Sequence, residues 1–198
     1  MISEHDNEPI PGLPGFLPTG EEILWQGSPE WKRLAMSAFH IRGIAAYFAA
    51  LALFGAVQGA WLGALITIGA GLAGLGVLAL LAWGSARTTL YTLTNKRVVM
   101  RIGIALPKCI NLPLTLVGSA DLSLHRDGTG DIPLHLLGPQ RLGYVALWPH
   151  ARPWKVAVPQ PMLRAVPDAQ AVAAMLARAC GARLSVAPAP AFQQALAA

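Results

Sequence analysis

One long apolar stretch constrains the fold of this 198-residue chain more than any other feature. None of the 44 residues between Arg42 and Arg87 is Asp, Glu, Lys, Arg or His. Crossing the hydrocarbon core of a bilayer takes about 20 apolar residues, so the stretch is too long for one crossing and long enough for two. Its most polar point is Gln58-Gly59, and backbone groups in lipid must be hydrogen-bonded internally. The sequence therefore predicts a helical transmembrane hairpin over residues 43–86.

Charge outside this stretch is uneven and predicts an orientation. Residues 1–42 carry a net charge of −3 and residues 87–198 a net charge of +8, while cations stand on both flanks of the stretch and the turn has none. The positive-inside rule then places both termini in the cytoplasm, as expected for a multi-pass protein of the inner or intracytoplasmic membrane. The acidic first residues lack the cationic n-region of a cleaved signal peptide. Cys109 and Cys180 are predicted to be unpaired thiols without a catalytic or metal-binding role.

The remaining chain is predicted to form a leader, a β domain and a tail. Residues 1–20 are acidic and Pro-rich and predict a disordered leader, and residues 184–198 predict a disordered Ala/Pro tail. Residues 21–42 hold a first short strand and a segment with helical apolar spacing. That segment either lies in the headgroup region or forms the first turns of the first span.

The composition of residues 87–183 predicts an antiparallel β domain that ends in a helix. Two β-rich runs flank a turn at residues 94–96, Pro-rich residues 149–167 predict a loop, and a helix is expected from Asp168 to a stop at Gly181. Further short strands are expected at Lys108–Leu112, Leu114–Val117, Ala120–His125, Ile132–Leu137 and Tyr144–Trp148.

Specific strings in the chain resemble a known family. The run Tyr91-Thr-Leu-Thr-Asn-Lys-Arg97 resembles the hairpin that opens bacterial PH-like domains, and residues 20–31 are similar to the strand that precedes a transmembrane hairpin in such domains. More narrowly, residues 85–89, 127–134, 147–154 and 161–168 resemble the PuhB family, the photosynthetic complex assembly proteins of purple bacteria.

The resemblance implies a fold and a role. The fold is an α+β membrane protein, in which a two-helix transmembrane hairpin follows the first strand of a PH-like antiparallel β-barrel or sandwich with a C-terminal helix. The role is a non-enzymatic assembly factor whose partners are reaction-centre and core light-harvesting polypeptides. The family offers no catalytic, cofactor or metal residues to carry over, so none is expected here.

An aromatic and basic cluster is the main candidate for a contact surface. Trp148, His150, Arg152 and Trp154 surround two prolines, and Trp and Arg are frequent in binding hot spots. The cluster could form a partner-docking surface, cap the β domain or rest on the bilayer interface.

Small residues in the apolar stretch are candidates for helix packing. Gly55, Gly59 and Gly63 follow the small-residue spacing that lets helices approach closely in lipid. The pattern serves packing within the hairpin or a partner helix, including one from a second copy of the chain.

Two polar groups invite a ligand interpretation. His125, Asp127 and Asp131 could hold a cation but also fit an ordinary polar turn around Gly128-Thr129-Gly130. His40, near the start of the apolar stretch, could ligate pigment or lie solvated at the interface.

Two functions of different classes fit these observations. The first is the membrane-anchored assembly factor. The second is a membrane-anchored PH-like module that binds lipid headgroups through its basic part and has no dedicated protein client. The cations are scattered and no recognition motif accompanies them, so nucleic acid is not an expected partner.

Overall fold

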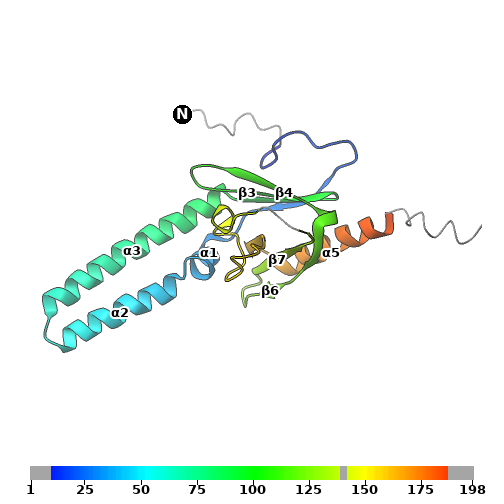
Figure 1. Cartoon of the computed structure of the whole chain (residues 1–198). Coiled ribbons are helices and arrows are strands. Elements are labelled where there is room, and N and C mark those ends of the chain that lie inside the picture. Colours follow the sequence, from blue (N-terminus) through cyan, green and yellow to red (C-terminus); the bar gives the residue numbers. More distant parts are fainter. Residues whose placement is uncertain (1–9, 139–141, 187–198) are drawn as a thin grey trace, which may run out of the picture.

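The computed structural model describes residues 10–138 and 142–186 and shows an antiparallel β module from which two helices project (Figure 1). Much of the predicted leader and tail falls on residues 1–9 and 187–198, outside the described residues. Within the part of the leader that is described, Leu13 is buried and Gln26 donates a hydrogen bond to the carbonyl of Pro11. This part therefore packs against the module.

The first sheet is built from strands on both sides of the apolar stretch. It contains β1 (Ile23–Gly27), β2 (Leu90–Thr94), β3 (Arg97–Ile102) and β4 (Lys108–Pro113), in that order and all antiparallel. The pairing of β1 with β2 joins residues that lie more than 60 positions apart, for example Gly27 with Tyr91. The two ends of the apolar stretch are thereby fixed next to each other.

The second sheet and a C-terminal helix complete the module. Strand β7 (Gly130–Leu136) pairs with β5 (Val117–Ala120), β6 (Ser123–Leu124) and β8 (Met162–Val166). Apolar side chains of both sheets form one core, and helix α5 (Ala169–Val186) packs on it through Val172, Leu176 and Ala179. The predicted antiparallel domain with a C-terminal helix is confirmed.

Several local predictions differ from the structure. Residues Leu114–Leu116 form a short 3-10 helix (η2), residues Tyr144–Leu147 form the helical turn α4, and β8 lies inside the predicted loop 149–167. Those three predictions are wrong. Helix α5 begins after Asp168 as expected but continues through Gly181 to Val186.

Helices α2 (Ile41–Val57) and α3 (Trp61–Thr88) lie side by side and extend away from the module, while α5 lies at its other end (Figure 1). The amides of Gly59 and Ala60 donate to the carbonyls of Ala56 and Gly55, with Gly59 at φ +76°. This is a Schellman ending, which glycine favours because it adopts the left-handed conformation without strain. The predicted break at Gln58-Gly59 is therefore correct.

Helix α1 (Trp31–Ser37) belongs to the junction between the helices and the module. Its Leu34 and Ala35 are buried against Ala82 and Ala86 of α3 and Ala165 of β8. Among the described residues, α3 is the one helix long and apolar enough to cross a membrane by itself, and α1 and α2 qualify together as a pair bent by 57°. Because only 11% of the apolar window of α3 is buried, α3 is not a core helix of the module.

Candidate interaction surface

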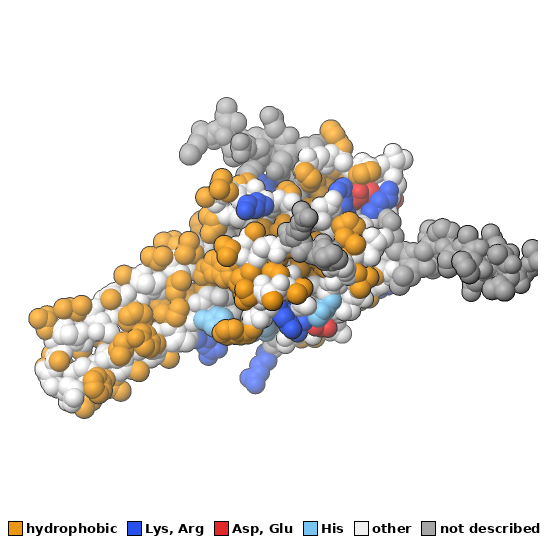
Figure 2. Space-filling view, in the orientation of Figure 1, with side chains coloured by type: hydrophobic (Ala, Val, Ile, Leu, Met, Phe, Trp, Pro, Cys, Tyr) orange, Lys and Arg blue, Asp and Glu red, His pale blue; other side chains and the backbone are white. Residues whose placement is uncertain are grey.

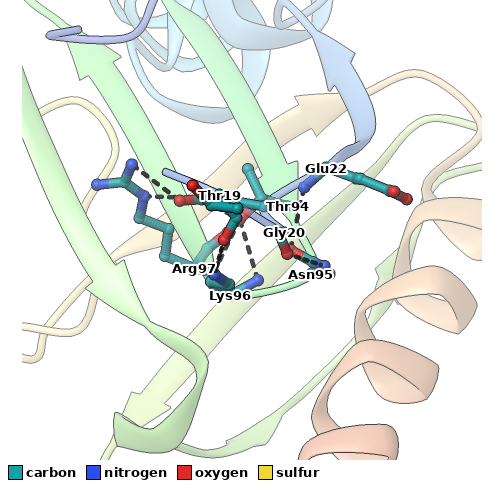
Figure 3. Close-up of polar contacts among 8 residues, drawn as sticks. Thr19, Gly20, Glu22, Thr94, Asn95, Lys96 and Arg97 are labelled. Atoms are coloured by element: carbon teal, nitrogen blue, oxygen red, sulfur yellow. Dashed lines mark hydrogen bonds and ion pairs between the residues drawn. The ribbon is translucent and has the colours of Figure 1, made fainter. Parts of the chain in front are cut away.

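The signature residues of the β2–β3 turn hold the N-terminal segment in place (Figure 3). Thr94 Oγ1 and Arg97 Nε each donate to Glu21 Oε1 at 2.8 Å. Asn95 accepts from the amide of Glu22 and donates to the carbonyl of Gly20. Burial by itself raises the pKa of Glu21, but hydrogen bonds from Arg97 and Thr94 outweigh it and the pKa is lowered. These residues therefore have a structural role.

His150 of the predicted cluster lies in the core. Its Nδ1 is hydrogen-bonded to the Tyr91 hydroxyl at 2.6 Å, its Nε2 lies 3.1 Å from Thr89 Oγ1, and the Tyr91 oxygen accepts from the amide of Arg164. Burial, and secondarily the charge of Arg164, lower the pKa of His150 to about 3, and burial raises the pKa of Tyr91. His150 is therefore a neutral, fully satisfied core residue that does not reach the surface.

Arg152 takes part in a polar network on the rim of the second sheet. Its guanidinium donates to Asp121 Oδ2 at 3.0 Å and to Gln160 Oε1 at 3.3 Å. The same carboxylate lies 2.8 Å from His135 Nε2. The hydrogen bond from His135 and the contacts with Arg152 lower the pKa of Asp121. Arg152 thus fixes the connection between α4 and β8 to the sheet.

The two tryptophans of the cluster are exposed. Trp148 packs edge-on against Phe39, at the bend between α1 and α2, with ring centroids 5.1 Å apart and 48% of its surface exposed. Trp154 is 93% exposed and has φ +63°. Exposed aliphatic side chains lie on α4 and on the connection to β8, namely Val145 on the helical turn and Val156 and Val158 on the connection. We call the exposed side chains of Val145, Trp148, Trp154, Val156 and Val158 the loop surface; it can contact an apolar partner.

The buried guanidinium of Arg164 ties this connection to the helices. Arg164 Nη1 donates to the carbonyl of Pro149 at 2.9 Å and Nη2 to the carbonyl of Ser37, the last residue of α1, at 3.4 Å. The part of the loop surface at Trp148 is therefore held at the junction from which α2 and α3 project.

The three glycines proposed for helix packing do not share one contact. Gly55 faces α3, because a Cβ there would lie 3.7 Å from Ala64, whereas Gly59 forms the turn and a Cβ at Gly63 would come near only Ala60. The close approach lies at Gly71 instead, where a Cβ would stand 2.9 Å from Phe48. The dense Gly/Ala pattern of α3 does not by itself distinguish Gly71 from the neighbouring glycines.

The two aspartates considered as cation ligands are engaged within the fold. Asp127 accepts from Arg33 Nε and Thr129 Oγ1, and Asp131 accepts from the amide of Ala165. These hydrogen bonds hold the pKa of Asp127 well below its usual range. His40 is exposed at the α1–α2 bend with φ +52°. Across residues 10–138 and 142–186, no group of three or more His, Cys, Asp or Glu is arranged for a metal ion.

A pocket at the base of α3 is a feature that the sequence did not reveal. It has a volume of about 390 Å³ and is lined by Ser28, Pro29, Trp31, Trp83, Ala86 and Arg87. These residues come from the β1–α1 turn, the start of α1 and the last turns of α3, more than 50 positions apart. The β1–β2 pairing and the packing of α1 on α3 bring them together.

The comparisons identify the fold family. Residues 41–179 match the model of the bacterial PH domain. A protein of Rhodobacter capsulatus, described as an uncharacterized 23.7 kDa protein in the puhA 5′ region, is 42% identical over 196 residues, which cover 93% of this chain and 92% of that protein. No solved structure matches the chain. PH-like domains are generally non-catalytic. The chain belongs to the bacterial PH-domain family.

Proposed function

We propose that this protein is a non-enzymatic, membrane-anchored assembly factor of the PuhB type for the bacterial photosynthetic reaction centre and its core light-harvesting complex. The observation that carries the proposal is the pair α2–α3, whose apolar side chains stay exposed although the pair is attached firmly to a PH-like module. On the face seen in Figure 2, charged side chains lie over the module and at the base of the pair, whereas the projecting part is apolar or uncharged. An apolar surface of this kind requires lipid or protein to cover it.

The genetic context of the relative supports a photosynthetic client. Its description places it in the puhA 5′ region, which suggests a photosynthesis-gene context for that protein. In the proposed mechanism, α2 and α3 anchor the chain in the inner or intracytoplasmic membrane and pack against transmembrane segments of the incoming subunits. The loop surface, held at the same junction in its part at Trp148, contacts the cytoplasmic faces of those subunits.

The test combines deletion with capture. Deleting the gene in a phototrophic host is expected to impair phototrophic growth and to leave respiratory growth unchanged. The tagged full chain is expected to retain reaction-centre or core light-harvesting polypeptides from phototrophic membranes in mild detergent. Normal levels of assembled complexes in the deletion strain would contradict the proposal.

The loop surface can be tested by single substitutions that spare the fold. Trp154→Ala removes an almost fully exposed ring, and Phe16→Ala, at a residue 81% exposed on the N-terminal segment, is the matched control. Trp154→Ala is expected to weaken client retention without changing the membrane content of the chain, whereas Phe16→Ala leaves both unchanged. Equal retention by the two variants would remove the loop surface from the mechanism.

The second candidate function is lipid-headgroup binding without a dedicated client. The observation that favours it is the net charge of +8 over residues 87–198, because a membrane-bound basic module is attracted to anionic headgroups. Under this alternative the deletion strain assembles normal complexes, and the captured chain carries anionic lipid without photosynthetic polypeptides.

A further inference from the structure

The pocket at the base of α3 combines two aromatic walls with unpaired positive charge. Trp31 and Trp83 line it and are 39% and 48% exposed, so their rings face both the pocket and the surroundings. The Arg87 guanidinium stands over the Trp83 ring at 5.3 Å from its centroid, and Lys32 Nζ stands over the Trp31 ring at 5.9 Å. Each cation is therefore placed next to a wall of the pocket.

These cations are available to a ligand. Within the described residues, neither Lys32 nor Arg87 forms an ion pair, whereas Arg33, Arg97 and Arg152 are each paired with a carboxylate. No Asp or Glu lines the pocket, and Ser28 adds a hydroxyl group. One unpaired guanidinium and a hydroxyl group line the cavity, and the Lys32 ammonium stands beside its Trp31 wall. These groups favour an anion with several oxygen acceptors.

The position of the pocket indicates the source of that anion. Exposed apolar side chains follow α3 from Trp61 to Trp83, and Arg87 comes one turn later. Trp at the end of an apolar helix and Arg just beyond it are the usual residues of the headgroup region. The volume of about 390 Å³ is within the range of small-ligand sites.

We propose that this pocket binds the phosphate-bearing headgroup of an anionic phospholipid, with Arg87 as the cation in its lining, Trp31 and Trp83 as its walls and Lys32 as a second cation beside Trp31. The inference rests on the membrane anchoring contained in the proposed function, and it adds a lipid site that the assembly role does not require. Phosphate is the shared chemistry of such a lipid and free inorganic phosphate, and the apolar helix beside the pocket favours the lipid.

The test uses the purified full chain in neutral detergent, titrated with phosphatidylglycerol or phosphatidylcholine and followed by native mass spectrometry. The wild-type chain is expected to retain phosphatidylglycerol in preference to phosphatidylcholine. Arg87→Gln is expected to weaken phosphatidylglycerol binding about fivefold, as for one well-placed cation, with little effect on phosphatidylcholine. Arg178→Gln removes an exposed cation of α5 and serves as the matched control, with unchanged binding.

Three outcomes would overturn the inference. They are equal retention of the two lipids, equal effects of Arg87→Gln and Arg178→Gln, and displacement of phosphatidylglycerol by inorganic phosphate, which would assign the site to the free anion. Should Arg87→Gln fail to fold, Lys32→Gln, beside the Trp31 wall, decides in the same assay, because Lys32 is exposed. A chain that resists carbonate extraction but shows no lipid preference contradicts only this inference, whereas a chain released by carbonate contradicts the proposed function.

Discussion

Individual side chains explain why the family signature has the residues it has. Tyr91 is fully buried, and its hydroxyl accepts from the Arg164 amide and is hydrogen-bonded to His150 Nδ1. The arrangement satisfies polar groups contributed by β2, β8 and the α4–β8 connection. A buried polar group without a partner costs about 1–3 kcal/mol, so this tyrosine is needed for folding and is not a surface recognition residue.

The first prediction concerns the pH dependence of stability. The unfolded chain binds a proton at His150 near pH 6.5, whereas the folded chain, with Tyr91, Thr89 and Arg164 around the imidazole, binds it only near pH 3. The unfolded state therefore holds more protons between these values, and stability falls as the pH falls. The free energy of unfolding is expected to decrease by about 2 kcal/mol between pH 6.5 and 5.

His150→Gln is the control for this prediction, because it keeps the other histidines and removes the titrating group. The variant is expected to be less stable at pH 7 but to lose less stability on acidification to pH 5. Denaturant unfolding of the full chain in detergent, followed by circular dichroism at each pH, measures both. Parallel curves for the two proteins would show that His150 does not contribute in this window.

The second prediction concerns the ion pair of the β2–β3 turn. The Glu21 side chain is 2% exposed and that of Arg97 is 19% exposed, so that removing the cation leaves a carboxylate largely out of water. Arg97→Gln is expected to lower the free energy of unfolding by about 3 kcal/mol, and the double variant Glu21→Gln/Arg97→Gln is expected to recover part of the loss. A loss below about 0.5 kcal/mol would instead be typical of a solvent-exposed pair.

At the scale of elements, the contact between α2 and α3 depends on one glycine. A Cβ at Gly71 would lie 2.9 Å from both Cβ and Cγ of Phe48, whereas a Cβ at Gly69 meets nothing within 4 Å. Gly71→Ala is expected to cost about 1–3 kcal/mol through overpacking. Gly69→Ala is expected to be neutral or to stabilise by up to about 1 kcal/mol, because alanine favours helix. Limited proteolysis of the two variants in detergent compares them, and equal cleavage rates would contradict the contact.

Elements with strong patterns were predictable from the sequence. The charge-free stretch with its Gln-Gly break, the two runs around Thr94-Asn95-Lys96 and the helix after Asp168 all correspond to observed elements. Each is specified by local composition: apolar length, β-branched residues around a turn, or apolar spacing at helical period.

Short elements set by tertiary contacts were not predictable in the same way. The prolines around strand β8 predict a loop, yet Pro161 and Pro167 flank the strand without interrupting it. Among the described strands, β8 pairs with β7 alone, so that it is an edge strand, where flanking prolines are tolerated. The four-residue turn α4 is too short for any period to distinguish it from a strand.

The candidate site, too, is only partly predictable from the local sequence. Four neighbouring residues suggested one surface, but His150 points into the core, Arg152 joins the rim network and only the tryptophans are exposed. Conversely, the pocket at Trp31, Trp83 and Arg87 depends on β1 pairing with β2 across the apolar stretch. No local pattern contains that pairing.

For the whole molecule, the same pairing constrains how the chain can lie in a membrane. Strand β1 precedes α2 and α3 and strand β2 follows them, and both belong to one sheet. The two ends of the helix pair must then be on one side of the bilayer. If α3 crosses the membrane, the bent α1–α2 segment must bring the chain across as well.

This constraint gives the last prediction, a topology that the chain's own cysteine can report. Cys109 on β4 is exposed, and residues 58–60 form the tip of the helix pair, opposite the module. In intact spheroplasts, a membrane-impermeant maleimide is expected to label Gln58→Cys and to leave the wild-type chain unlabelled. Cys180 adds little background, because burial raises the pKa of its thiol. After lysis, Cys109 should react in both proteins. Labelling of the wild-type chain before lysis would place the module outside the cytoplasm and contradict the orientation. An unlabelled tip, with Cys109 reactive only after lysis, would mean that α2 and α3 enter the bilayer without crossing it.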